Sequence, residues 1–135
     1  MVSNSLFREV KKVVEEILDL NAYYSENELR VMPAGTDCLY VYWEMTWSRM
    51  HAVAQFTDQD FRVLPKGLRI YDVTDILFDG SNAHFYRDEW VEESSDHKYI
   101  YNLPQGRNYI VDYGCFSQEE FIRLKRSTMV SLLCE

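Results

Sequence analysis

The sequence of 135 residues is poor in the residue types that mark fibrous, low-complexity and disulfide-stapled proteins. It has 5 glycines, 3 prolines and 3 cysteines, which excludes collagen-like and low-complexity chains. Cys38, Cys115 and Cys134 are odd in number, widely spaced and without a Cys-x-x-Cys pair. Disulfide frameworks use even, dense cysteines and zinc sites use closely paired ligands, so we expect three reduced thiols.

Positive charge is also scarce. The 14 basic and 22 acidic side chains give a net charge of −8. The densest basic clusters, at 8–12 and 123–126, hold three basic residues each and have acids beside them. Because nucleic acids and anionic membranes bind through positive patches, we expect neither as a partner.

Long apolar runs are absent as well. No segment approaches the ~20 apolar residues of a membrane-spanning helix. Charged residues at 8–12 interrupt the apolar residues near the start, so no secretory signal is expected there. The expected compartment is the cytoplasm.

Recognisable catalytic and metal-binding patterns are missing too. There is no Gly-x-Gly-x-x-Gly, phosphate-binding loop or nucleophile elbow, and His51, His84 and His97 are scattered. Counted from Asp75, the twelfth position of a calcium loop is Tyr86 instead of Glu. We therefore expect no catalytic residue, no metal and no cofactor.

Aromatic residues, in contrast, are abundant: 10 Tyr, 7 Phe and 3 Trp make up 15% of the chain. Disordered chains are poor in aromatics, and this length suits one folded domain, which excludes disorder for most of the sequence.

The clearest predicted helix spans residues 3–20. Its apolar positions are Leu6, Val10, Val13, Ile17 and Leu20, widened by Phe7, Val14 and Leu18. This three-or-four spacing is typical of an amphipathic helix, which docks on its own domain or on a partner. We divide the chain into this helix with its connector, residues 1–28, and a domain at 29–135.

The rest of the sequence indicates short strands. We predict strands at 29–32, 38–44, 68–74, 84–86, 98–103, 108–116 and within 121–133, and a helix at 46–56 capped by Thr46. Alternation in the second strand places Leu39, Val41 and Trp43 on one face and Tyr40 and Tyr42 on the other. The predicted fold is a mainly β sandwich with an N-terminal helix and a helix inserted after the Trp43 strand.

The segment Leu103-Pro-Gln-Gly106-Arg-Asn-Tyr109 resembles the corner between the fifth and sixth strands of fibronectin type III domains. Those domains place a Leu, a Gly three positions later and a Tyr six positions later. The resemblance implies that Tyr109 buries its ring and returns its hydroxyl to upstream backbone. It also implies that Trp43 is the core tryptophan of the second strand. The helix at 46–56 departs from that family's pattern.

A closer resemblance covers roughly residues 29–131. A bacterial domain family of unknown function carries a Tyr-x-Tyr-Trp-Glu strand, a Leu-Arg-x-Tyr-Asp-Val-Thr strand, a Trp, a Pro-Gly-Arg-x-Tyr corner and an Arg-Ser segment. The matching segments here are 40–44, 68–74, Trp90, 104–109 with one residue inserted, and 126–127. The resemblance sharpens the fold and implies no activity.

Aromatic side chains that point away from the sandwich core are the candidate binding surface. If Ile100 and Leu103 point inward, Tyr99 and Tyr101 point outward beside Tyr40 and Tyr42. The full candidate set is Tyr40, Tyr42, Tyr99, Tyr101, Trp47, Trp90, Arg69 and Arg107. Such a surface suits a protein partner or the apolar ring faces of a carbohydrate, unless the helices cover it.

The sequence therefore favours a non-enzymatic interaction module, a protein–protein adaptor or a self-associating domain, in the cytoplasm of a bacterium. A homodimer is expected through the N-terminal helix or the apolar last strand at 129–133. The alternative is a carbohydrate-binding sandwich with an aromatic stacking surface. An enzyme would need a pocket with convergent polar groups, for which Arg69, Asp72 and Arg107 are the first candidates.

Overall fold

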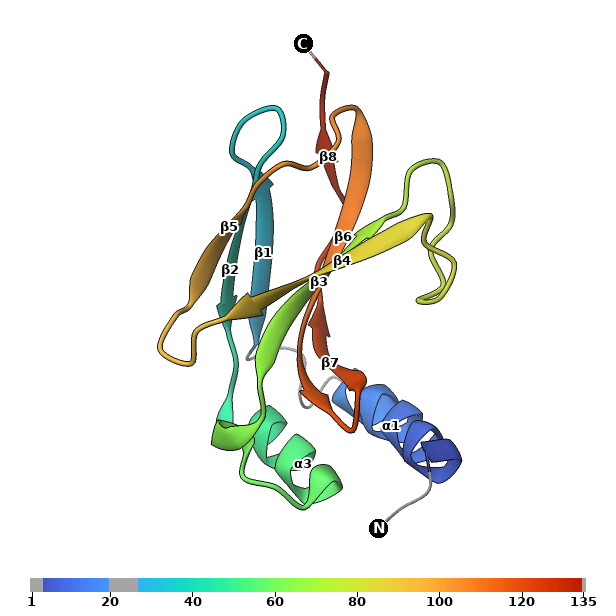
Figure 1. Ribbon diagram of the computed structural model, residues 1–135, viewed down its shortest axis with the longest axis vertical. Coiled ribbons are helices and arrows are strands. Elements are labelled where there is room, and N and C mark those ends of the chain that lie inside the picture. The colour runs from blue at the N-terminus through green and yellow to red at the C-terminus, as the bar shows by residue number, and fades with distance from the viewer. Residues whose placement is uncertain (1–3, 20–26, 135) are drawn as a thin grey trace.

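The computed structural model describes residues 4–19 and 27–134 and contains two β-sheets packed face to face (Figure 1). The elements are α1 (Asn4–Leu18), β1 (Glu28–Pro33), β2 (Leu39–Glu44), α3 (Trp47–Thr57), a 3₁₀ turn η1 (Phe61–Val63), β3 (Lys66–Asp72), β4 (Phe85–Val91), β5 (His97–Ile100), β6 (Arg107–Ser117), β7 (Glu120–Arg126) and β8 (Val130–Leu132).

One sheet has the strand order β1-β2-β5. The other has the order β4-β3-β6-β7, and β8 pairs with the first part of β6. All pairings are antiparallel. The prediction of a mainly β sandwich with an N-terminal helix and a second helix after the Trp43 strand is confirmed.

The core lies between the two sheets, as alternation in the strands requires. In β2, Leu39, Val41 and Trp43 are buried and the residues between them are more exposed. The Trp43 ring stacks on the ring of Tyr113 from the opposite sheet, with centroids 5.4 Å apart and planes at 28°. The expected core tryptophan therefore packs across the interface between the two sheets.

The corner before β6 has the geometry that the Leu-Gly-Tyr pattern implied. The Tyr109 side chain is completely buried, and its hydroxyl donates a hydrogen bond of 2.7 Å to the Pro104 carbonyl oxygen. Gly106 has a φ of +72°, which L residues rarely adopt. Burial raises the pKa of the Tyr109 phenol to about 12. The phenol is thus a neutral donor.

Helix α1 buries a different part of its apolar surface from the part that its spacing suggested. Phe7 and Leu18 are buried. Leu6, Val10, Val13 and Ile17 are 50%, 37%, 53% and 41% exposed. The reason is that α1 lies at the end of the sandwich, against β7 and α3, instead of across a sheet face (Figure 1). Polar contacts with β7, such as Arg8–Glu120 and Asp19–Arg123, fix its position.

Three local predictions need correction. The expected short strand at 84–86 extends to Val91, because its outward residues are polar or aromatic and conceal the alternation. The final segment forms two strands, since the pairing of β7 with β6 ends at Arg126 and the Val111 amide donates to the Ser127 side-chain Oγ instead of to a backbone carbonyl. Thr46 precedes α3 without a side-chain cap, and its amide donates to Asn27 Oδ1 at 2.7 Å.

Candidate functional site

Four of the candidate tyrosines lie together on the outer face of the β1-β2-β5 sheet. Tyr40 is directly opposite Tyr99 on β5 and Met32 on β1. The Tyr40 and Tyr99 ring centroids are 5.0 Å apart with a 52° tilt, and Tyr101 follows at 6.2 Å from Tyr99 with planes at 22°. We call Met32, Tyr40, Tyr42, Tyr99 and Tyr101 the tyrosine surface.

Part of the tyrosine surface is open to solvent in the part of the chain that the structure describes. Tyr99 and Tyr101 are 46% and 60% exposed, Met32 is 50% exposed, and Tyr40 and Tyr42 are half-buried. Two hydrogen bonds attach β5 and the residue after it to β4 of the other sheet. Arg87 Nη2 donates to the Tyr101 carbonyl at 2.7 Å, and Lys98 Nζ donates to the Trp90 carbonyl at 2.5 Å. The rings therefore stand on an anchored backbone.

The other four candidates lie elsewhere. Trp90 is 61% exposed on β4, and its ring is 4.7 Å from that of Phe116 on the outer face of the second sheet. Arg69 lies on the same outer face. The side chain of Trp47, at the start of α3, is outside the described part of the chain.

Arg107 is engaged by a buried carboxylate. Its Nε donates to Asp72 Oδ2 at 2.7 Å, and Asp72 also accepts from the amide and hydroxyl of Thr74. Burial alone would raise the pKa of Asp72, but the bonds from Arg107 and Thr74 outweigh it and hold that pKa below its usual value. These contacts tie the end of β3 to the start of β6.

A ladder of alternating charges crosses the second sheet. Of its residues, only Arg69 was among the sequence-predicted candidates. The register places Asp88, Arg69, Asp112 and Arg126 side by side on β4, β3, β6 and β7. Arg69 binds Asp88 through Nε and Nη2 at 2.8 and 3.0 Å, and Arg126 binds Asp112 through the same two atoms, both at 2.9 Å. We call these four residues the charge ladder.

Aromatic rings pack between the charges of this ladder. The Arg69 guanidinium lies 4.3 Å from the Tyr86 ring centroid and 4.6 Å from that of Phe121, and the Arg126 guanidinium lies 4.9 Å from that of Phe78. Tyr71 donates its hydroxyl to Asp112 Oδ2 at 2.9 Å. Burial, then the Asp112 charge, raises the pKa of Tyr71. The sequence signal that could have revealed this face is the alternation of polar residues with Leu68 and Ile70 in β3, and with Val111 and Tyr113 in β6.

The remaining titratable groups form no catalytic arrangement among the described residues. His84 contacts the Thr74 carbonyl and His97 contacts Asp96. Burial raises the pKa of the Cys115 thiol to about 12, which makes it a poor nucleophile. Within residues 4–19 and 27–134, no group of three His, Cys, Asp or Glu side chains could hold a metal ion, and no helix is long and apolar enough to cross a membrane.

Comparisons with known proteins agree with this architecture. A family model described as a domain of unknown function (DUF4912) matches residues 24–134. No curated protein sequence matches the chain. Among solved structures, the chain is similar to the FN5 domain of Drosophila Lar, with a TM-score of 0.50 and 8% identity over 80% of this chain and 94% of that one. It is also similar to the fn3 domain of human collagen alpha-1(XX), with a TM-score of 0.51 and 15% identity over 80% and 84% of the two chains. These likenesses show a fibronectin type III-like fold and nothing about ligands.

Proposed function

The chain belongs to the DUF4912 family of domains of unknown function, and we propose that it is a non-enzymatic interaction module that binds a protein partner through the tyrosine surface. The observation that carries this proposal is the contact of three rings, Tyr40, Tyr99 and Tyr101, on an outer sheet face where Tyr99 and Tyr101 remain about half exposed. The described helices pack elsewhere, α1 against β7 and α3, and α3 against α1 and η1.

The chemistry of the tyrosine surface favours a protein. Tyrosine offers a large rigid ring and a hydroxyl at low entropic cost, and is enriched among the residues that dominate binding energy at interfaces. Met32 adds a flexible apolar side chain that adapts to irregular surfaces. The anchored backbone at Tyr101 means that little ordering is required on binding.

The side chains outside the tyrosine surface support the part of the proposal that assigns no enzymatic activity. The buried carboxylates Asp72 and Asp112 are both engaged by arginines. The free thiols Cys38, Cys115 and Cys134 fit a reducing compartment, in keeping with action in a bacterial cytoplasm.

A carbohydrate is the second candidate ligand, favoured by the nearly parallel rings of Tyr99 and Tyr101. Sugar rings stack on aromatic faces that lie flat in a common plane. The 52° tilt between Tyr40 and Tyr99 removes Tyr40 from such a plane, which is why the protein partner ranks first.

The experiment is affinity capture from the native cell with the full chain, followed by quantitative mass spectrometry. We expect Tyr99→Ala/Tyr101→Ala and Tyr40→Ala/Tyr42→Ala to lose a specific protein, with a loss of roughly 2 kcal/mol or more for a pair of central aromatic residues. Tyr86→Ala, an exposed tyrosine on the opposite sheet, is the matched control and should retain it. Equal capture by all variants would refute the assignment, and binding to a glycan array that disappears only in the double variants would favour the carbohydrate.

A further inference from the structure

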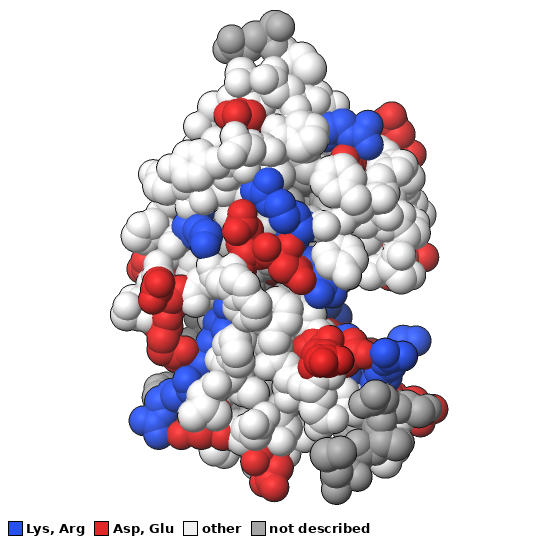
Figure 2. All heavy atoms as spheres, in the orientation of Figure 1, with Lys and Arg blue, Asp and Glu red and all other residues white. Residues whose placement is uncertain are grey.

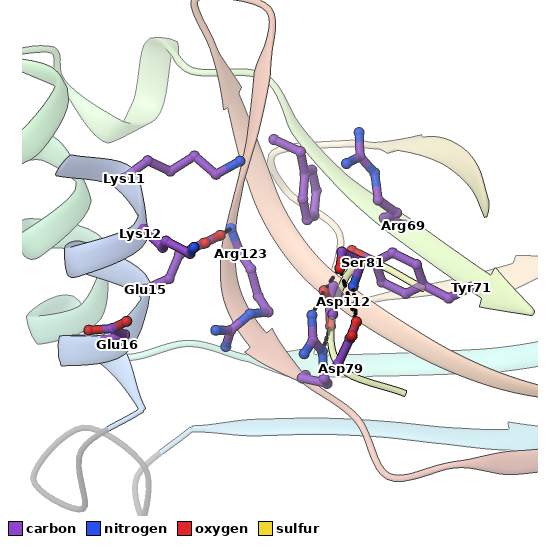
Figure 3. A pocket seen from close by; sticks show the side chains of 13 residues that line it. Lys11, Lys12, Glu15, Glu16, Arg69, Tyr71, Asp79, Ser81, Asp112 and Arg123 are labelled. Carbon is purple, nitrogen blue, oxygen red and sulfur yellow. Dashed lines mark hydrogen bonds and ion pairs between the residues drawn. The ribbon is translucent and has the colours of Figure 1, made fainter. Parts of the chain in front are cut away.

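A groove separates α1 from the outer face of the second sheet. It encloses about 500 Å³ and is lined by Lys11, Lys12, Glu15, Glu16, Arg69, Tyr71, Asp79, Gly80, Ser81, Asp112, Phe121, Arg123 and Arg126. Figure 3 shows the α1 side chains on one side, which forms a wall, Arg69 and Tyr71 over the sheet that forms the floor, and Arg123 between them. In Figure 2 the molecule is hollowed at its right side, where acidic and basic side chains meet. We call this space the basic groove.

The basic groove concentrates positive charge in an acidic protein. Five of the chain's 14 lysines and arginines line it, although the net charge is −8. Three of the four acids that line it are occupied by groups of the protein itself, and the fourth, Glu16, is exposed on α1. Asp112 is fully buried beneath Arg126 and Tyr71, Asp79 accepts from the amide and hydroxyl of Ser81, and Glu15 accepts from the Arg123 amide.

Two guanidinium groups are fixed on the floor of the groove. Asp88 and Asp112 each bind one edge of an arginine, and the neighbouring rings hold the planes of both groups. Each arginine uses Nε and Nη2 in this way, so Nη1 of Arg69 and of Arg126 has no hydrogen-bond partner among the described residues. Such preorganised donors bind oxyanions with little loss of side-chain entropy.

The opposite wall and the loop over the floor complete the site. Lys12 on α1 is exposed and has no ion-pair partner in the part of the chain that the structure describes. Gly80 has a φ of +98°, and a Cβ at this position would lie 3.4 Å from Arg126 Nη1. The loop backbone thus approaches this guanidinium closely without a side chain over it.

We propose that the basic groove binds a small anion that carries phosphate or carboxylate groups, held by Arg69 and Arg126 on the floor and by Lys12 from the α1 wall. The volume falls within the ~300–1,000 Å³ of small-molecule sites. The negative charge of the rest of the chain disfavours a long polyanion. A compact anion inside the groove can contact Arg69, Arg126 and Lys12, whereas Lys11 and Arg123 are paired with Glu120 and Asp19. This site is on the opposite sheet from the tyrosine surface and does not depend on it.

The test is a titration of the full chain with pyrophosphate and, separately, with citrate at constant ionic strength, followed by ¹⁵N NMR of the arginine Nε–H groups and by calorimetry. We expect saturable shifts at Arg69 and Arg126 and at the Gly80 and Ser81 amides. A response to pyrophosphate alone identifies a phosphate ligand, a response to citrate alone identifies a carboxylate ligand, and a response to both identifies a general oxyanion site.

The variants separate a site from a general charge effect. Lys12→Glu, at an exposed position, should weaken binding by about tenfold, the size expected for one charge-assisted hydrogen bond. Arg30→Glu makes the same change of net charge on the opposite sheet and should leave binding unchanged. Tyr99→Ala/Tyr101→Ala should also leave it unchanged. Absence of saturable binding by both probes, or equal weakening by Lys12→Glu and Arg30→Glu, would overturn the proposal.

Discussion

The Tyr109 hydroxyl donates to the Pro104 carbonyl oxygen at 2.7 Å, which closes the corner between β5 and β6. Tyr109→Phe removes only this donor and should lower the free energy of unfolding by about 1–2 kcal/mol, because the completely buried Tyr109 side chain loses its hydrogen bond. Urea unfolding should show a lower midpoint with an unchanged slope. Tyr101→Phe, at a 60% exposed tyrosine, is the control and should shift the midpoint little. Identical midpoints for both variants would contradict the role of the corner.

The buried Asp72 should make stability depend on acid pH. Its pKa is lowered in the folded protein, so the stabilisation is present above the pKa of the unfolded chain, ~4, and is lost as pH falls through the folded value. Asp72→Asn should be less stable than the natural chain at pH 7 and should lose less further stability on acidification. Urea unfolding at pH 7, 5, 4 and 3 measures both effects. Parallel pH profiles for the two proteins would contradict the assignment.

The exposed stripe of α1 should mediate self-association. Leu6, Val10, Val13 and Ile17 are spaced by four, three and four residues, so an antiparallel second copy places Leu6 opposite Ile17 and Val10 opposite Val13. We expect a homodimer at micromolar concentration in light scattering, and a monomer for Val13→Glu with its fold retained. Val63→Glu, at a 68% exposed valine outside α1, should remain dimeric. A monomeric natural chain would refute this prediction.

Replacement by alanine should destabilise the protein to different extents at Gly67 and Gly114, the two glycines within strands of the second sheet. A Cβ on Gly114 would lie 2.2 Å from the Ile122 carbonyl oxygen, and one on Gly67 would lie 2.7 Å from the Phe116 ring and 2.9 Å from the Glu89 carbonyl oxygen. Gly114→Ala should therefore cost more than Gly67→Ala. The cost should be at or above the ~1–3 kcal/mol of ordinary overpacking, because the β7 backbone must move. Thermal unfolding of both variants tests this order.

The alternation of apolar residues predicted the sandwich, its core tryptophan and the outward tyrosines, because side-chain direction in a strand follows from position alone. Leu103, Gly106 and Tyr109 predicted the corner through their resemblance to the fibronectin type III corner, and the structure gives Gly106 a positive φ and Tyr109 a buried hydroxyl donor there. The division of the chain at residue 28 and the homodimer remain predictions. Where β4 ends was not predictable, because its outward residues gain their partners from β3 and β6, which are distant in the sequence.

The sequence by itself determined a fibronectin-like sandwich and an outward direction for Tyr40, Tyr42, Tyr99 and Tyr101. Only the tertiary structure decided that Tyr99 and Tyr101 stay about half exposed, because the two described helices, α1 and α3, lie at one end of the sandwich and not on this sheet face. It also decided which charges meet. Asp88, Arg69, Asp112 and Arg126 are distant in sequence and become neighbours through the register of four strands. Local periodicity specifies the face on which a side chain lies, whereas its neighbours on that face depend on how the strands pair.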